Sequence, residues 1–361
     1  MANLSIQKIA HTLIIIVLGT LILKEGAFLF VPLMWGAFFA FALNPISSWL
    51  EDRRIPRGVA VFLSICLVVV FFSGIIYLLV NQLTGLIEDI PEITASIQNR
   101  LDEYIGSLND QFGLGVDYDK VKTQISDSLN PKNMNVLVFQ TGRTLTLMGI
   151  IPLYIFLLMY YKDFFKEFLH KLNASRDEEF SFSWSGDYGR LIQSYLTGLV
   201  KVTGIVAVLS GIYFYLIDIQ YFVLFALFIA IMNLIPYVGV IISSFFTVLY
   251  VFLTSDTFLY PILTLVVLWG IQLLENNIIT PVVVGAEVKL NALVVLLSIL
   301  IGGWVWGVSG MILFIPILGI IKITLEKSEN HKPFAYLLSD NIPVRDGRKN
   351  LWKMFLSKFK K

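Results

Sequence analysis

Residues 58–80 read GVAVFLSICLVVVFFSGIIYLLV and contain no charged side chain. A helix of about 20 apolar residues is long enough to cross the ~30 Å hydrocarbon core of a bilayer. Because lipid offers no hydrogen-bond partners, the backbone groups of a single spanning segment must bond within that segment, as they do in a helix. The stretch therefore predicts a transmembrane helix, and it decides the fold class of the chain.

Seven more regions of this kind lie on either side of it. Hydrophobic residues make up 57% of the 361-residue chain and charged residues 15%, and the mean hydropathy is +0.77. These values exceed what a soluble domain can keep in water. We therefore predict an all-α, polytopic membrane protein with about eight transmembrane helices, the other seven at residues 12–23, 27–50, 144–161, 202–217, 219–255, 257–274 and 290–321.

Two of these regions, both in the C-terminal half, are too long for one straight span. Residues 219–255 are interrupted by Pro236 and Gly239, and residues 290–321 by Gly302 and Gly303. Proline and glycine break helices, so each region is either a kinked span or a re-entrant hairpin with arms shorter than the hydrocarbon core. The sequence leaves both alternatives open.

The basic residues predict the orientation. Short cytoplasmic loops retain Lys and Arg, and here these residues gather at 53–57, at 162–190 and from Lys322 onward. We expect a protein of the inner (cytoplasmic) membrane with both termini in the cytoplasm. The predicted organisation is transmembrane helices 1–3 in residues 1–80, an extramembrane amphipathic segment in 81–143, transmembrane helices 4–8 with the transport site in 144–325, and a cytoplasmic basic tail in 326–361.

Two segments outside the spans predict amphipathic helices. The first has apolar residues at helical spacing from Leu83 to Leu108, and this stripe packs either on the membrane domain or bilayer surface, or on another subunit. Its near-heptad series favours a homo-oligomer. The second, KNLWKMFLSKFKK at residues 349–361, predicts a helix on the anionic inner leaflet, with an unstructured basic tail as the alternative.

Polar side chains at membrane depth are candidates for a transport path, because they are costly in lipid unless they face a cavity or another helix. Gln272, Glu275 and Asn276 share one helical face, and Asn277, Thr280 and Pro281 follow directly. A carboxylate beside a helix-breaking proline can bind a cation or carry a proton. The alternative is a glutamate that only reaches interfacial water.

A second group of candidates lies on the helix that contains Lys201. Ser194, Thr197 and Lys201 share a face, and Gly198 permits close approach of a neighbouring helix. Lys201 either neutralises Glu275 or extends its ammonium group to the headgroups.

The third group surrounds a proline in the long region 219–255. Pro236 frees a backbone carbonyl, and Gly239 lets the chain turn tightly. With Asn233 and Tyr237 beside them, these residues predict a place where backbone and amide groups coordinate an ion or polar solute at mid-membrane. The alternative is a kink used only for packing.

The residue inventory argues against several functional classes. The single cysteine, Cys66, excludes an intrachain disulfide, and three scattered histidines argue against a His-rich metal site. The chain has no Walker-type glycine loop, no G-x-S-x-G and no H-E-x-x-H. We expect no cofactor, no metal site, no nucleic-acid partner and no enzyme activity.

Four stretches resemble the autoinducer-2 exporter family: SYLTG from Ser194, IPYVG from Ile235, ENNIITPVVVG from Glu275 and GVSGMILFIP from Gly307. The resemblance implies eight transmembrane helices, a hydrophilic segment after the third, and a transport role. In the family that role includes export of the signal autoinducer-2 and, in some members, exchange of sodium or lithium for protons.

We therefore expect a secondary transporter or exporter of a small polar solute or signal resembling autoinducer-2. The alternative is a sodium(lithium)/proton antiporter of the same family. The expected partners are the lipid bilayer and either a small polar solute or a monovalent cation or proton. From a different class, the chain could instead be a membrane scaffold or regulator that acts through its outer helix.

Overall fold

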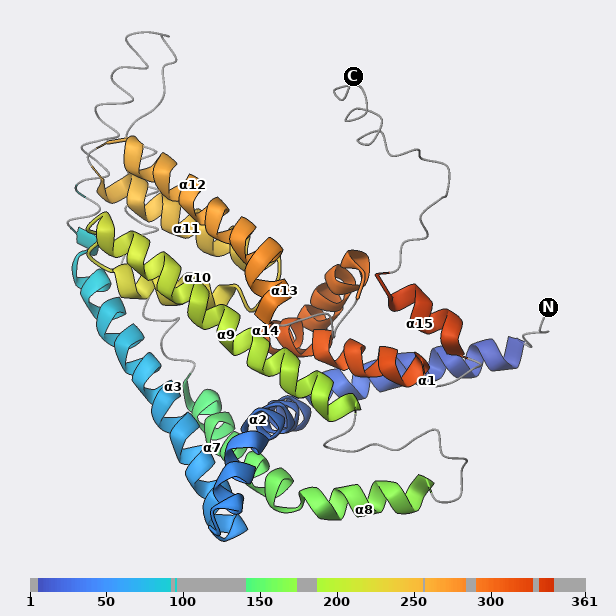
Figure 1. Cartoon of the computed structure of the whole chain (residues 1–361). Helices are drawn as coiled ribbons and strands as arrows, with labels where there is room; N and C mark the ends of the chain where they lie inside the picture. The colour runs from blue at the N-terminus through green and yellow to red at the C-terminus, as the bar shows by residue number, and fades with distance from the viewer. Residues whose placement is uncertain are drawn as a thin grey trace, which may run out of the picture.

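The computed structural model describes residues 6–91, 95, 141–173, 187–255, 257–283, 290–326 and 331–340. Within these ranges the regular structure is helical, apart from one isolated antiparallel bridge between Leu290 and Ser339. This confirms the all-α prediction. The helices, shown in Figure 1, are α1 (Ile6–Glu25), α2 (Ala27–Asp52), α3 (Arg57–Glu88), α7 (Thr141–Tyr160), α8 (Lys162–Asn173), α9 (Asp187–Leu216), α10 (Phe222–Met232), α11 (Val238–Thr254), α12 (Leu259–Leu274), a π-helix (Glu275–Ile279), α13 (Thr280–Val283), α14 (Ala292–Glu326) and α15 (Lys332–Leu338).

The outer surface of these helices is apolar. Five helical segments are long and apolar enough to cross a membrane: Ala27–Asp52, Arg57–Glu88, Ile192–Leu216, Leu259–Val283 and Ala292–Glu326. Large apolar side chains point outward along them, as Val70 (71% exposed) and Trp269 (65% exposed) illustrate. Exposing so large an apolar area to water would be energetically unfavourable, whereas contact with lipid is not. The protein is therefore a multi-pass membrane protein.

Inside this surface the helices pack in neighbouring groups. Helices α2, α3 and α7 share a buried cluster around Ala40, Val61 and Met159, while α9 to α12 pack around Phe214 and Leu268. A third cluster joins α14 to the turn between α10 and α11. In Figure 1 the helices α9, α11 and α12 run roughly parallel; α12 contacts both α9 and α11, and α3 contacts α10.

Polar contacts hold α3 at both of its ends. At its start, Arg57 Nη1 pairs with Asp163 Oδ2 of α8 at 2.7 Å. Beyond its end, Asp89 accepts hydrogen bonds from the Tyr221 hydroxyl and from Gln220 Nε2, the latter at 2.9 Å. The Tyr221 hydroxyl is the donor in its contact, because a carboxylate oxygen can only accept.

Region 219–255 folds back on itself as a helical hairpin. Helices α10 and α11 lie in contact and are joined by residues 233–237 (Figure 1). The eleven residues of α10 extend only about 16 Å, which is too short for the ~30 Å hydrocarbon core. This region is therefore a re-entrant hairpin, not a kinked span.

Region 290–321 also folds back on itself, at a kink within α14. Trp306 and Gly307 leave helical geometry, and Gly307 has φ +61°. In a straight helix Gly302 and Gly310 would lie about 12 Å apart. Instead, a Cβ placed on Gly310 would lie 1.9 Å from the Gly302 carbonyl oxygen, so the two arms of α14 touch. The first arm, residues 292–305, extends only about 21 Å, again too short to span.

The predicted amphipathic segments fall only partly within the described residues. Helix α3 continues to Glu88, so Leu83 and Leu86 belong to the same helix as the third apolar region. Residues 96–140 and the predicted tail helix at 349–361 lie outside the described ranges. Within the predicted basic tail, the structure adds the short helix α15.

Candidate transport site

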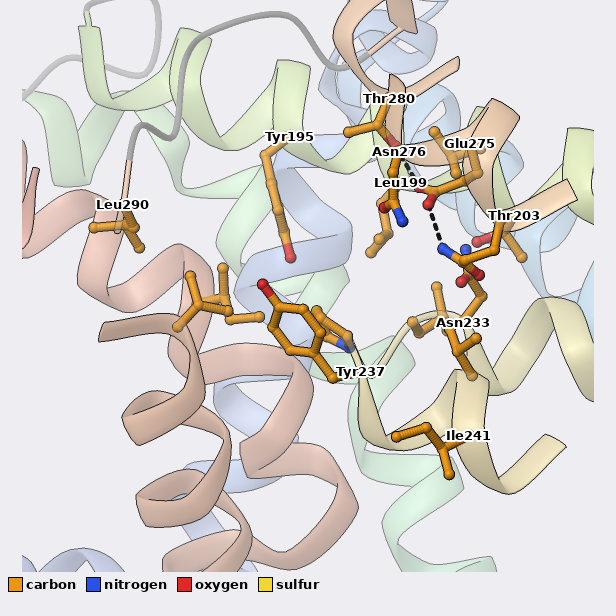
Figure 2. A pocket seen from close by; sticks show the side chains of 17 residues that line it. Tyr195, Leu199, Thr203, Asn233, Tyr237, Ile241, Glu275, Asn276, Thr280 and Leu290 are labelled. Atoms are coloured by element: carbon orange, nitrogen blue, oxygen red, sulfur yellow. Dashed lines mark hydrogen bonds between the residues drawn. The ribbon is translucent and has the colours of Figure 1, made fainter. Parts of the chain in front are cut away.

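A cavity of about 490 Å³ lies where α9, the α10–α11 hairpin, the end of α12 and both arms of α14 meet (Figure 2). It lies in the half of the bundle where α9 begins and α12 ends. Its wall combines apolar side chains with amides, hydroxyls and one carboxylate. The lining residues are Tyr195, Leu199, Val202, Thr203, Asn233, Leu234, Pro236, Tyr237, Val240, Ile241, Gln272, Glu275, Asn276, Thr280, Leu290, Val295 and Ile315.

Glu275 is the ionisable group of the cavity wall, and it is only 8% exposed. Its Oε2 accepts a hydrogen bond from Gln272 Nε2 at 2.7 Å, and its Oε1 accepts one from the Thr280 hydroxyl. Among the ion pairs of the described residues, none involves Glu275. A carboxylate held by neutral donors, without a fixed counter-ion, can take up a proton or attract a cation.

A change of helix type brings Thr280 to this carboxylate. Residues Glu275–Ile279 form a π-helix between α12 and α13. In an α-helix, residues five apart point in directions about 140° apart, whereas the wider π-helical turn places residue i+5 over residue i. Single π-turns inside α-helices occur often at functional sites. The π-turn therefore lets Glu275 accept hydrogen bonds from Gln272 of α12, which precedes it, and from Thr280 of α13, which follows it.

The turn of the α10–α11 hairpin forms the opposite wall. Asn233, Pro236 and Tyr237 line the cavity, and Val238 N donates to the Pro236 carbonyl at 2.7 Å. This bond closes a γ-turn around Tyr237, whose φ of +63° is strained for a residue with a side chain. Gly239 makes the turn possible, because a Cβ there would lie 1.7 Å from the Met232 carbonyl oxygen.

Two tyrosines form the part of the wall that faces α14. Figure 2 shows the hydroxyl ends of Tyr195 from α9 and Tyr237 from the hairpin pointing toward one another. Asn276 and Glu275 lie on the other side of the cavity. A solute in this space would meet hydroxyl, amide and carboxylate groups from three separate elements.

The structure thus brings six of the predicted site residues to one cavity. These are Asn233, Pro236, Tyr237, Gln272, Glu275 and Asn276. Gly239 lies directly behind them, buried in the turn that it makes possible.

The predicted residues of α9 do not line this cavity. Thr197 and Lys201 are exposed, Ser194 is half-buried and Gly198 is buried. The cavity face of α9 is instead formed by Tyr195, Leu199, Val202 and Thr203, which point roughly opposite to Lys201. The suggested pairing of Lys201 with Glu275 is not formed, so that alternative is wrong.

Asn277 and Pro281 also lie outside the cavity lining. Both are exposed, and Asn277 Nδ2 donates to the Leu273 carbonyl of its own helix at 2.8 Å. The sequence places Thr280 directly after the amides of this helix, whereas Tyr195 and Thr203 are polar lining residues that sequence reasoning missed. The spacing of Tyr195, Leu199, Val202 and Thr203 follows a helical face and could have indicated them, whereas nothing in the sequence marks the π-turn that brings in Thr280.

Comparison with known proteins identifies the family of the chain. The family described as AI-2E family transporter matches residues 12–330. The chain is 25% identical over 338 residues to "AI-2 transport protein TqsA" of Escherichia coli (strain K12), covering 91% of this chain and 95% of that protein. It is 26% identical over 310 residues to "Putative transport protein YrrI" of Bacillus subtilis (strain 168), covering 82% and 86%. Since the family matches most of its length, the chain belongs to the AI-2E family of membrane transporters.

Proposed function

We propose that the cavity around Glu275 binds a small polar solute or signal resembling autoinducer-2, and that the protein exports it across the cytoplasmic membrane as a secondary transporter. The observation that carries the proposal is the buried carboxylate, held by the neutral donors Gln272 and Thr280, in a cavity otherwise lined by amides, hydroxyls and apolar groups. Ligand sites of this size are mostly apolar with a few placed polar groups. The relative TqsA is named an AI-2 transport protein, which supports autoinducer-2 as the first solute to test.

A second candidate function uses the same carboxylate differently. Because no described basic side chain pairs with Glu275, the carboxylate could exchange a proton for sodium or lithium within one transport cycle. The family resemblance implies such antiport for some members only, and in this chain it predicts flux driven by an imposed pH gradient.

The deciding experiment uses the purified full-length protein in proteoliposomes. Autoinducer-2 flux and sodium flux are measured separately, each with and without a pH gradient, for the wild type and for Glu275→Gln. We expect Glu275→Gln to abolish proton-coupled or cation-coupled flux while leaving folding intact, because the amide cannot carry a proton or the charge that attracts a cation. The matched control is Glu88→Gln, an exposed carboxylate at the end of α3, which should leave flux unchanged.

Each result points to one interpretation. Autoinducer-2 flux that is independent of ion gradients favours the exporter, and sodium flux coupled to protons favours the antiporter. Glu275→Gln flux equal to wild type at every pH would remove Glu275 from the mechanism. Absence of any flux would favour the scaffold function. Deletion of residues 83–108 separates the two classes further, because a scaffold should lose its function whereas a transporter should retain some flux.

We further propose that the protein lies in the inner membrane with both termini cytoplasmic and that it self-associates. The support is the distribution of Lys and Arg residues and the near-heptad series in the outer segment. Protease sensitivity of terminal tags in intact cells, and the mass of the detergent-solubilised protein, test the two statements independently.

A further inference from the structure

The short helix α15 buries little side-chain area against the other described residues. It contains seven residues, packs on α14, and buries one side chain completely, Ala335 at 3% exposure. Tyr336 and Leu337 on the same helix are exposed. An element with so little buried apolar area separates from its neighbour at low cost.

One residue, Asn291, makes three hydrogen bonds to the end of α15 and the residue after it. Asn291 Nδ2 donates to the Leu337 carbonyl at 2.7 Å and to the Ser339 carbonyl at 3.3 Å, and Asn291 N donates to the Leu338 carbonyl at 3.1 Å. The same side chain accepts from Val294 N at 2.9 Å, at the start of α14. Asn291 therefore fixes the first arm of α14 and the end of α15 at the same point.

This point lies directly beside the transport cavity. Leu290, which forms the isolated bridge with Ser339, lines the cavity, as does Val295 in the next turn. Leu338 packs against a buried cluster that contains Leu290 and Ile235, the latter from the turn of the α10–α11 hairpin. The contact between α15 and Asn291 thus supports the cavity wall on the side where α12 ends.

We propose that Leu290, Asn291, the Leu338 side chain and the backbone of residues 337–339 form a latch that keeps this side of the cavity closed and must open for solute to pass. We refer to these residues as the Asn291 latch. Asn291 is a positioning residue here, since it acts through Leu290 and α14 and does not itself line the cavity. The part of the inference that concerns passage of solute rests on the proposed transport function, whereas closure of the cavity does not.

Closure is tested by cysteine accessibility, which requires no transport. In a Cys66→Ala background in nanodiscs, Val295→Cys reports on the cavity and Thr247→Cys, fully buried in α11, reports on general loosening. Asn291→Ala and Leu338→Ala should raise the maleimide labelling rate at Val295→Cys by about tenfold, the factor expected for the net loss of one or more hydrogen bonds or packed side chains. Labelling at Thr247→Cys should not change.

Leu337→Ala is the matched control, because it changes the neighbouring, exposed side chain and keeps the carbonyl that Asn291 binds. It should label at the rate of the parent. If Asn291→Ala leaves labelling of Val295→Cys unchanged, or if Leu337→Ala raises it equally, the latch is overturned. The same holds if both reporters rise together, since the variants would then only destabilise the protein.

Opening is tested by a reversible lock. Residues paired in an antiparallel bridge have Cα atoms about 4.5–5.5 Å apart, within the range of a disulfide, so Leu290→Cys with Ser339→Cys should cross-link on oxidation. Autoinducer-2 or sodium flux, whichever the wild type shows, should stop in the oxidised protein and return on reduction. Equal flux in both states would overturn the opening step. If the wild type shows no flux, the proposed function fails, while the labelling result still decides closure.

Discussion

The contact between Gly302 and Gly310 allows a quantitative test of the α14 hairpin. A Cβ on Gly310 would lie 1.9 Å from the Gly302 carbonyl oxygen, whereas real Cβ atoms stay at least 3.0 Å from other heavy atoms. In Gly310→Ala the arms must therefore separate by about 1.1 Å at this point. The contact is backbone to backbone, so no side chain can rotate to relieve it.

The expected cost follows from known effects of overpacking. Inserting a methyl group where the surroundings must shift costs about 1–3 kcal/mol. We expect Gly310→Ala to lower the midpoint of thermal unfolding in detergent by several degrees. Because Val295 and Ile315, one on each arm, line the cavity, flux in proteoliposomes should also fall.

The control is Gly270→Ala in α12, where a Cβ would meet no atom within 4 Å. Alanine favours a helix over glycine by up to about 1 kcal/mol, so this variant should equal or exceed the wild type in stability. A Gly310→Ala protein with a midpoint equal to that of Gly270→Ala would refute the close approach of the two arms, and with it the hairpin geometry of α14.

Two further variants test individual hydrogen bonds. Thr280→Val removes a hydrogen-bond donor to Glu275 and should lower flux about tenfold, which corresponds to about 1.4 kcal/mol. Thr280→Ser keeps the hydroxyl and should retain wild-type flux. Equal flux for the valine and serine variants would exclude a role for the hydroxyl. Tyr221→Phe removes the donor to Asp89 and should lower the free energy of unfolding by about 0.5–1.5 kcal/mol in denaturant titration. An unchanged stability in Tyr221→Phe would mean that this contact does not hold α3 to the α9–α10 turn.

The sequence alone determined the class of the protein and much of its polar site. Long uncharged stretches predict membrane helices because a backbone in lipid has no other way to bond its polar groups, and this holds whatever the tertiary structure. Gln272 and Glu275 lie three residues apart on one helix, so their contact is local and could be predicted. Pro236 and Gly239 likewise marked a break that the structure contains.

Only the tertiary structure decided how those helices bend and which faces meet. A proline or glycine in the sequence predicts that a helix changes direction there, but not by what angle. The second arm of α14 folds back on the first because the two arms contact each other at Gly302 and Gly310. The cavity side of α9 carries Tyr195 and Thr203, while Lys201 points away, because packing against distant helices selects the face. The π-turn that brings Thr280 to Glu275 is local, but neither hydropathy nor spacing marks it. The contact of α15 with Asn291 also depends on packing, because 46 residues separate Asn291 from Leu337. Hydropathy and spacing are properties of neighbouring residues, whereas these contacts join groups whose proximity arises only when the whole chain has packed.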